Sequence, residues 1–385
     1  MSNAPITHID IAAFTADPYP ALKQMRTEAP ITYVPELGAT LITKRIDVHE
    51  QEKRIETFSS LQPDGLMTKL MGENMMRKDG DAHLRERKIL FPALSPKTVN
   101  NHWKAIFEAR ALEILEALLP NGRCDLVKDY AMPVSAEALK AITGLVNMET
   151  AHMDHVSQAM IDGCANYAGD AETEARCNAA TASIDAHIEE MWDAAPELSA
   201  LAVQKAGGMS KESLHANIKL IISGGQNEPR DAIAGTLWAL LTHPDQFTLV
   251  KSGNYTYQNA FSEYARWISP IGMSPRRIAQ TDTIKDVTFE PEDRAFLMFA
   301  SACRDEDWFE DPDRFDLTRD TQAAISFGAG PHFCAGAAAA RCLITEVAIP
   351  LAVKHMKNLR LDGDVPFTGW AFRGPTAMPV AWDAP

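Results

Sequence analysis

One cysteine of the sequence lies where a glycine-rich loop runs into an alanine-rich segment. Cys334 follows Gly328 and Gly330, which give the backbone the freedom that a tight bend needs. Residues 337–347 favour a helix that begins just after the cysteine. The N–H groups and the positive dipole at the start of a helix favour a thiolate over a thiol. The loop therefore predicts that Cys334 is a metal ligand.

The residues around this cysteine form the pattern Phe-x-x-Gly-x-His-x-Cys-x-Gly, made by Phe327, Gly330, His332, Cys334 and Gly336. The pattern closely resembles the signature of the cytochrome P450 superfamily, in which a cysteine thiolate is the axial ligand of haem iron. The alternative is a buried structural cysteine in a glycine-rich turn. The resemblance implies haem b as cofactor, contacted by Phe327, His332 and Gly336.

The resemblance covers essentially the whole chain and implies a single domain over residues 1–385. The implied fold is mainly α-helical with a smaller β region (α+β), and its long central helix lies over the haem. Apolar side chains recur at helical spacing over residues 103–118, whereas residues 31–43 and 287–299 favour strands. The length of 385 residues and the hydrophobic content of 46% are sufficient for a large core.

Charge and cysteine spacing limit the kinds of partner. A net charge of -15 argues against binding to nucleic acid, which needs clustered Lys and Arg. The sequence has no signal-peptide pattern and no apolar run of about eighteen residues, so we expect a cytoplasmic protein without membrane contact. The six cysteines include no C-x-x-C pair, which argues against zinc, iron–sulfur and disulfide sites. The resemblance implies a separate electron donor, a ferredoxin or a ferredoxin-type reductase.

Residues 210–243 predict one long helix with an interruption in its middle. Pro229 cannot donate a hydrogen bond to the carbonyl of Gly225 and crowds it, and Gly224 precedes this point. An interior Pro destabilises a helix by about 3 kcal/mol and each Gly by about 1 kcal/mol relative to Ala. We therefore predict a kink at Gly225 that leaves room for a small ligand or water. The alternative is two helices joined by a Gly-Gly turn.

The central helix of the superfamily usually carries an acid followed by an alcohol near this distortion. Here the matching residues are Asn227 and Glu228, which we take as the catalytic residues. The resemblance implies that this amide and carboxylate organise the water that supplies protons during oxygen activation. The departure also makes direct use of hydrogen peroxide, as in a peroxygenase, more plausible.

Other residues match positions that hold the haem or its loop in the superfamily. Glu263 and Arg266 lie three apart on a predicted helix, and Arg314 of the segment 312–315 is expected to join them in a buried network. The resemblance assigns contacts to the haem propionates to His83, Arg87, Arg277 and His332, and a contact to Gly225. We also predict that Arg85, Lys88 and Arg341 form a basic patch for the electron donor.

Short motifs indicate a branch of the superfamily. Residues 227–229, 268–271 and 369–376 resemble those of bacterial aromatic O-demethylases of the guaiacol type. This likeness implies a pocket for a methoxylated ring, with substrate contacts from Gly224, Ile271, Ser274 and Phe372. The predicted reaction converts a methoxyarene into a phenol and formaldehyde. A methylated sugar or a terpenoid is an alternative substrate, and a peroxide-driven peroxygenase or a non-catalytic haem sensor is an alternative function.

Overall fold

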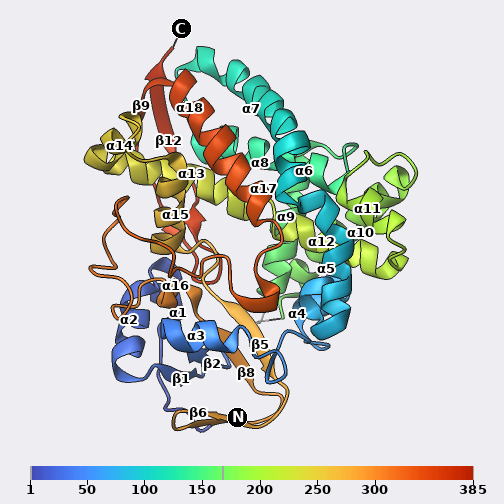
Figure 1. Cartoon of the computed structure of the whole chain (residues 1–385), viewed down its shortest axis with the longest axis vertical. Helices are drawn as coiled ribbons and strands as arrows, with labels where there is room; N and C mark the ends of the chain where they lie inside the picture. The colour runs from blue at the N-terminus through green and yellow to red at the C-terminus, as the bar shows by residue number, and fades with distance from the viewer. Residues whose placement is uncertain (1, 167–168, 385) are drawn as a thin grey trace. The chain divides into compact units, whose positions relative to one another are not determined.

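The computed structural model describes residues 2–166 and 169–384, and the chain divides into two compact units. Unit 1 comprises Met1–Gln62, Gly235–Cys334 and Val365–Thr376. Unit 2 comprises Pro63–Ala234, Ala335–Asp364 and Ala377–Pro385. Helices predominate, with the longer ones in unit 2, and the largest sheet belongs to unit 1 (Figure 1). This confirms the predicted α+β class, while the single domain over residues 1–385 stays a prediction.

Unit 1 contains short helices and most of the strands. Its helical segments are α1 (Ile11–Ala16), α2 (Tyr19–Glu28), α3 (Arg45–Gln51), α14 (Pro244–Lys251), α15 (Tyr257–Ile268), α16 (Phe299–Ala302) and the 3-10 turn η5 (Gly330–His332). Its strands are β1 (Ile31–Val34), β2 (Ala39–Ile42), β3 (Phe58–Ser59), β5 (Ser274–Ile278), β6 (Asp282–Ile284), β7 (Val287–Phe289), β8 (Arg294–Leu297), β10 (Phe367–Thr368) and β11 (Gly374–Pro375).

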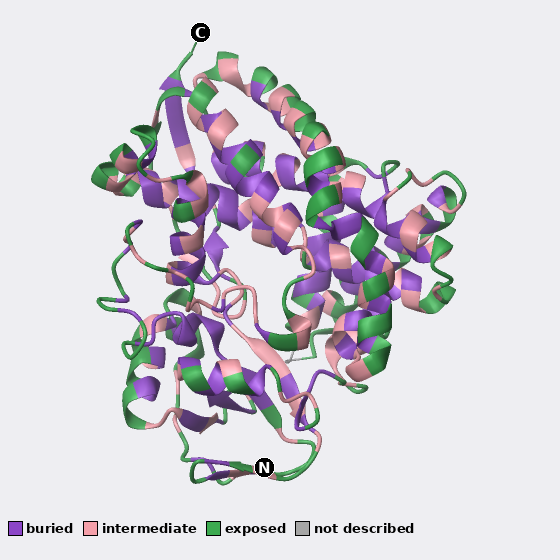
Figure 2. Ribbon diagram, viewed as in Figure 1, coloured by how far each residue is buried: buried purple, intermediate pink, exposed green. Residues whose placement is uncertain are grey.

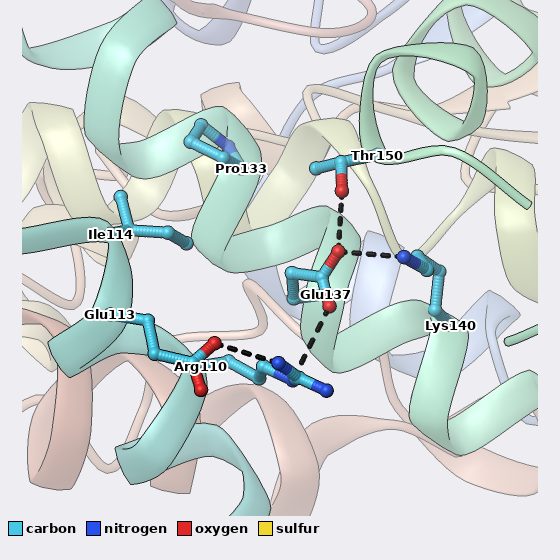
Figure 3. A pocket seen from close by; sticks show the side chains of 7 residues that line it. All are labelled: Arg110, Glu113, Ile114, Pro133, Glu137, Lys140 and Thr150. Carbon is cyan, nitrogen blue, oxygen red and sulfur yellow. Dashed lines mark hydrogen bonds and ion pairs between the residues drawn. The ribbon is translucent and has the colours of Figure 1, made fainter. Parts of the chain in front are cut away.

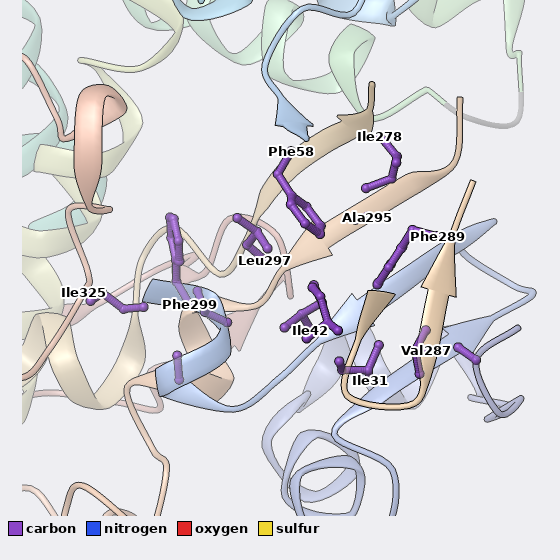
Figure 4. Close-up of a cluster of buried hydrophobic side chains, with 14 of the residues drawn as sticks. Ile31, Ile42, Phe58, Ile278, Val287, Phe289, Ala295, Leu297, Phe299 and Ile325 are labelled. Carbon is purple, nitrogen blue, oxygen red and sulfur yellow. The ribbon is translucent and has the colours of Figure 1, made fainter. Parts of the chain in front are cut away.

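The main sheet of unit 1 has the order β1-β2-β8-β5-β3, in which only the β2–β8 pair is parallel. The β1–β2 hairpin confirms the strands predicted within residues 31–43, and Gly38 takes a φ of +58° at its turn. Side chains from several of these strands form a buried cluster, shown in Figure 4, in which the rings of Phe58 and Phe289 meet edge to face. The cluster extends to Ile325, and it therefore anchors the chain just before the cysteine loop.

Unit 2 is mainly helical. Its α-helices are α4 (Leu66–Met71), α5 (Gly80–Leu94), α6 (Pro96–Thr98), α7 (Lys104–Leu118), α8 (Met132–Thr143), α9 (Thr150–Cys164), α10 (Ala171–Met191), α11 (Ala200–Ala206), α12 (Lys211–Ser223), α17 (Ala337–Arg341) and α18 (Ile349–His355). Its other helical segments are η1 (Met75–Arg77), η2 (Val99–Trp103), η3 (Leu119–Asn121), η4 (Leu126–Ala131) and η6 (Cys342–Ala348). Its strands, in the sheet order β4-β12-β9, are β4 (Arg123–Asp125), β12 (Pro379–Asp383) and β9 (Lys357–Leu361).

Burial in unit 2 follows the helical periodicity of the sequence. On α7 the buried residues Phe107, Ala111 and Leu115 recur every four positions, which confirms the predicted helix, whereas α8 is buried along most of its length (Figure 2). The predicted helix after Cys334 is also present, as the consecutive segments α17, η6 and α18. In the part of the chain that the structure describes, no helix combines the length and the hydropathy needed to cross a membrane.

The predicted interruption of the central helix is confirmed. Helix α12 ends at Ser223, and α13 (Asn227–Thr242), whose residues belong to both units, begins after Gln226. The segment therefore forms two helices joined by a glycine turn, which is the alternative that the sequence left open. The break falls at Gly225, whose carbonyl has no helical partner because Pro229 lacks an N–H, and the two glycines give the backbone the freedom to turn there.

Candidate functional site

The loop that carries Cys334 lies in unit 1 and is held by its own backbone. Gly328 and Gly330 have φ values of +73° and +63°, which side chains rarely adopt. The N–H of Gly328 donates to Ile325 O at 2.8 Å, and the N–H of Cys334 donates to Phe327 O at 3.0 Å. These bonds fold residues 325–334 into a compact bend with Cys334 at its end.

Cys334 is the exposed member of the six cysteines, all of which lie in the described part of the chain and none of which forms a disulfide there. Burial raises the pKa of Cys342 to about 11 and those of Cys124 and Cys164 to about 12, so these thiols stay protonated at neutral pH. An exposed cysteine on a bend that is fixed by two left-handed glycines fits a thiolate ligand of haem iron. The chemistry of this loop therefore agrees with the cofactor that the sequence implies.

Three phenylalanine rings, two of the loop and one of α15, lie in a row within unit 1. The ring of Phe327 lies 6.0 Å from that of Phe261 on α15 and 6.3 Å from that of Phe333, measured between centroids. Phe333 is 39% exposed, next to the exposed cysteine. An exposed ring beside an exposed thiol gives this end of the loop an apolar surface suited to a flat, apolar group.

Glu263 and Arg266 form the buried pair that the sequence predicts. The guanidinium of Arg266 donates two hydrogen bonds of 2.7 Å to the carboxylate of Glu263, and both side chains are at most 1% exposed. Arg266 also donates to the carbonyls of Cys303, Pro312 and Arg314. The pair therefore fixes the irregular segment that follows α16.

The prediction that the Arg314 side chain completes this network is wrong. The Arg314 guanidinium is 62% exposed and pairs with Asp311 and Asp316, and only its backbone carbonyl accepts from Arg266. Arg319, five residues later and 9% exposed, donates to Glu263 Oε1 at 3.2 Å instead. The path of the backbone, which the local motif does not define, turns Arg319 inward and Arg314 outward.

Unfolding measurements distinguish the two arginines. Arg319→Ala should lower the free energy of unfolding by about 3 kcal/mol, because it leaves part of a buried carboxylate uncompensated. Arg314→Ala should change it by less than about 1 kcal/mol, as expected for an exposed ion pair. Urea titration of both variants measures these changes. If Arg314→Ala lowers the free energy of unfolding as much as Arg319→Ala or more, Arg314 is the arginine that completes the network.

The residues predicted to contact the haem propionates are distributed over both units. Arg277, on β5 of unit 1, donates from Nε to Leu61 O at 2.9 Å and forms an ion pair with Glu292. His332 lies in η5 of the same unit. In unit 2, His83 is buried on α5 and Arg87 is half-buried one helical turn later. Their contacts with the haem stay predictions, as does that of Gly336, the residue just before α17.

Hydroxyl groups from neighbouring helices satisfy the carbonyls at the break of the central helix. Ser135 on α8 donates to Gln226 O at 2.7 Å and lies 3.4 Å from Gly225 O. Ser157 on α9 donates to Ile222 O at 3.2 Å. A Cβ at Gly225 would lie 2.5 Å from Ile221 O and 3.0 Å from Leu139 Cδ1, so no side chain fits there. The break is therefore built into the packing of unit 2.

Three consecutive side chains after the break are incompletely hydrogen-bonded: Gln226 and Asn227 are buried, and Glu228 is half-buried with its Oε2 atom inside. Gln226 Nε2 donates to Asp154 Oδ1 and Asn227 Nδ2 donates to Gln158 Oε1, each at 3.1 Å. Gln226 Oε1, Asn227 Oδ1 and Glu228 Oε2 have no hydrogen-bond partner among the described residues. Buried polar atoms of this kind are normally satisfied by ordered water or a ligand. The sequence predicted Asn227 and Glu228 here but not Gln226.

Charge within this cluster is arranged around Glu228. Its burial raises the pKa of its carboxyl group from 4.5 to about 7, because the charged form loses its hydration. Arg230, which pairs with Asp231 at 2.8 Å, only partly offsets this effect. Glu228 can therefore hold or release a proton near neutral pH, which is the property that a proton-transfer group needs. Asp154 and Gln158 come from α9, and no local pattern indicated them.

The predicted substrate residues of unit 1 are partly brought together. Ile271 and Phe372 form an isolated β-bridge, and the N–H of Gly272 donates to Ala371 O at 2.8 Å. The ring of Phe372 is 38% exposed, so it remains accessible. Ser274 begins β5 and accepts a hydrogen bond from Arg276. Gly224, the other predicted contact, is the C-cap of α12 in unit 2.

A surface pocket of about 400 Å³ lies in unit 2, and none of the predicted site residues lines it (Figure 3). Glu137 on α8 accepts hydrogen bonds from Lys140 and from Thr150, and Arg110 pairs with Glu113 at 2.7 Å. The four charged side chains that line the pocket are therefore paired with one another.

Known proteins resemble this chain in sequence and in fold. The family model described as Cytochrome P450 matches residues 243–349. The vitamin D(3) 25-hydroxylase of Pseudonocardia autotrophica is 28% identical over 95% of this chain and 94% of the relative. The cytochrome P450 monooxygenase PikC of Streptomyces venezuelae is 26% identical over 96% of this chain and 92% of the relative.

Solved structures resemble it over nearly the whole chain. P450BioI, in complex with hexadec-9Z-enoic acid ligated acyl carrier protein, has a TM-score of 0.87 and 20% identity, and covers 97% of this chain and 100% of that chain. CalO2 has a TM-score of 0.85 and 22% identity, and covers 98% of this chain and 100% of that chain. At these identities the two structures show the fold alone, and the sequence relatives carry the evidence for family and activity.

Proposed function

Because the chain belongs to the cytochrome P450 family and is a haem-thiolate monooxygenase, we propose that it O-demethylates a small methoxylated aromatic compound. The cofactor is haem b. The observation that carries the assignment of the ligand is the exposure of Cys334 at the end of a loop that two left-handed glycines fix. The reaction would give a phenol and formaldehyde.

Each group of residues has a distinct task in this proposal. Haem b, held by the Cys334 thiolate, supplies the oxidising chemistry when bound, and the protein supplies position and electrostatics. Glu228 holds a proton on its buried carboxyl group up to about pH 7. The side-chain oxygens of Gln226 and Asn227, which have no partner among the described residues, would accept hydrogen bonds from the water that relays protons.

Support for an aromatic substrate comes from unit 1. The Ile271–Phe372 bridge pairs the backbones of these two residues, and Phe372 is 38% exposed, so its ring is available to stack on another ring. The short motifs that resemble aromatic O-demethylases include both residues. The vitamin D(3) 25-hydroxylase among the relatives makes a large apolar substrate the competing proposal.

A binding screen followed by a product assay tests the substrate class. Methoxybenzenes, methylated sugars and sterols are titrated against the haem-loaded protein, and the Soret band is followed. Formaldehyde is then measured with each ligand that binds, in the presence of a ferredoxin and its reductase. We expect spectral shifts and formaldehyde with methoxybenzenes, whereas hydroxylated sterol without formaldehyde would contradict O-demethylation.

Peroxide-driven turnover is a second candidate, favoured by the residues at the central break. Glu228 replaces the alcohol that the superfamily usually has, and a buried carboxyl group can move a proton of hydrogen peroxide. Product formed with hydrogen peroxide and no reductase, and lost in Glu228→Ala, would support this function. Turnover that needs the reductase at every peroxide concentration would exclude it.

We also propose that α5 docks the electron donor. Arg85 and Lys88 are exposed on this helix, and Leu84 and Phe91 beside them are 54% and 61% exposed, so basic and apolar groups are adjacent. A basic rim with an exposed apolar centre suits an acidic ferredoxin. Arg341, the third residue of the predicted basic patch, is half-buried at the end of α17.

Charge reversal tests this surface. The double variant Arg85→Glu/Lys88→Glu should slow reduction by ferredoxin at least about tenfold at low salt, because steering between opposite charges is lost. Stopped-flow spectroscopy of the haem measures the rate. Lys128→Glu/Arg176→Glu makes the same change of charge on exposed residues of η4 and α10, and its rate should stay near that of the wild type. If both double variants are reduced by ferredoxin at the same rate, α5 is not the docking surface.

A further inference from the structure

Helix α3 ends against the loop that carries the proposed thiolate ligand. Glu52 is the C-cap residue of α3 and is 1% exposed. A Cβ at Gly330 would lie 2.8 Å from the carbonyl oxygen of Glu52 and 3.2 Å from Lys53 Cα, so the two backbones touch and exclude any side chain. Glycine is therefore required at position 330 by this contact as well as by its positive φ.

The carboxylate of Glu52 joins this loop to strand β5. Its Oε1 accepts from Arg276 Nη2 at 2.5 Å, and its Oε2 accepts from the backbone N–H of Ala329 at 3.2 Å. Ala329 lies between the two left-handed glycines of the loop. One buried carboxylate thus fixes both the bend before Cys334 and the strand that carries Arg277.

Arg276 is arranged to hold this carboxylate. Its side chain is 3% exposed, and Nη1 also donates to Ser274 Oγ and to Pro275 O. Its Nε has no hydrogen-bond partner among the described residues, so Glu52 supplies the compensating negative charge. Removing either partner leaves a buried charge without its counter-ion.

We infer that Glu52 is a positioning residue for the Cys334 loop, and that the Glu52–Arg276 pair sets the electrostatic environment of the thiolate ligand. The inference rests on the proposed function of Cys334. Because the pair is neutral as a unit, it holds the loop without adding net charge beside it. Loss of the Glu52 charge leaves the Arg276 cation, which favours the reduced haem, and loss of the Arg276 charge leaves the carboxylate, which disfavours it.

Three variants and one control test the inference on the haem-loaded protein. Glu52→Gln should shift the midpoint reduction potential in the positive direction, and Arg276→Gln should shift it in the negative direction. Glu52→Ala should increase the ratio of protein without thiolate ligation to thiolate-ligated protein about tenfold, because a charged hydrogen bond to Ala329 is lost. This ratio is read from the Soret band of the reduced carbon monoxide complex.

The control is Asp47→Asn on the same helix. Asp47 is buried and pairs at 2.6 Å with Lys285, between β6 and β7, and not with the cysteine loop, so its loss should reduce stability but leave the potential and the Soret band unchanged. If Glu52→Gln and Arg276→Gln behave like this control, the pair is only structural and the inference is wrong. If the wild type itself lacks the red-displaced Soret band, the proposed function fails instead. The two glutamine variants keep the test valid if Glu52→Ala does not fold.

Discussion

Replacing Cys334 with serine should abolish the red-displaced Soret band of the reduced carbon monoxide complex, together with substrate oxidation. A serine hydroxyl stays protonated at neutral pH and does not donate electron density to iron as a thiolate does. Cys334 is exposed, and its N–H bond to Phe327 O is made by the backbone, so the loop should keep its conformation. The measurement is an absorption spectrum of reduced protein under carbon monoxide, taken with a haem assay.

Cys342→Ser is the matched control for this experiment. Cys342 is buried in η6, and burial raises the pKa of its thiol to about 11, so it is not a thiolate at neutral pH. The control should keep the red-displaced band and the activity. Persistence of that band in Cys334→Ser would show that another group ligates the iron, and the proposed function would then have to be abandoned.

Glu228→Gln should lower the rate of monooxygenation by about 10²-fold or more, which is the usual contribution of a positioned acid or base. Glutamine keeps the size of the side chain but cannot donate an acidic proton. Because the pKa of Glu228 is about 7, the rate of the wild type should fall as pH rises through 7, while the residual rate of the variant should not respond there. Product formation at saturating substrate and donor, measured against pH, tests both statements.

Glu228→Gln should also change how the free energy of unfolding depends on pH. Burial raises the pKa of Glu228 from 4.5 in the unfolded chain to about 7, so ionisation destabilises the fold as pH rises through this window. Relative to the wild type, Glu228→Gln should therefore gain about 3 kcal/mol of unfolding free energy between about pH 4.5 and about pH 7. Urea unfolding at several pH values measures the difference.

Glu137→Gln serves as the control, because the difference in unfolding free energy between this variant and the wild type should change with pH in the opposite direction. Burial tends to raise the pKa of Glu137, but hydrogen bonds from Lys140 and Thr150 outweigh it and lower the pKa. The ionised form of Glu137 therefore stabilises the fold, and this contribution is lost as pH falls. A difference between wild type and Glu228→Gln that does not depend on pH would show that Glu228 is not perturbed by burial.

The sequence determined the features that depend on neighbours along the chain. The bend at Gly328 and Gly330 and the break at Gly225 follow from backbone chemistry that a few consecutive residues define. The pairing of Glu263 with Arg266 follows from their spacing on one helix. These features could be predicted because every group they require lies within a few residues.

Only the tertiary structure decided which distant groups complete these features. It brings Ser135 to the carbonyls of the central break, Arg319 rather than Arg314 to Glu263, and Glu52 with Arg276 to the cysteine loop. The last pair is separated by 224 residues in sequence. A buried charge or carbonyl must find a partner, but its position in the sequence does not specify which one, because packing selects the partner from all groups that the fold brings near.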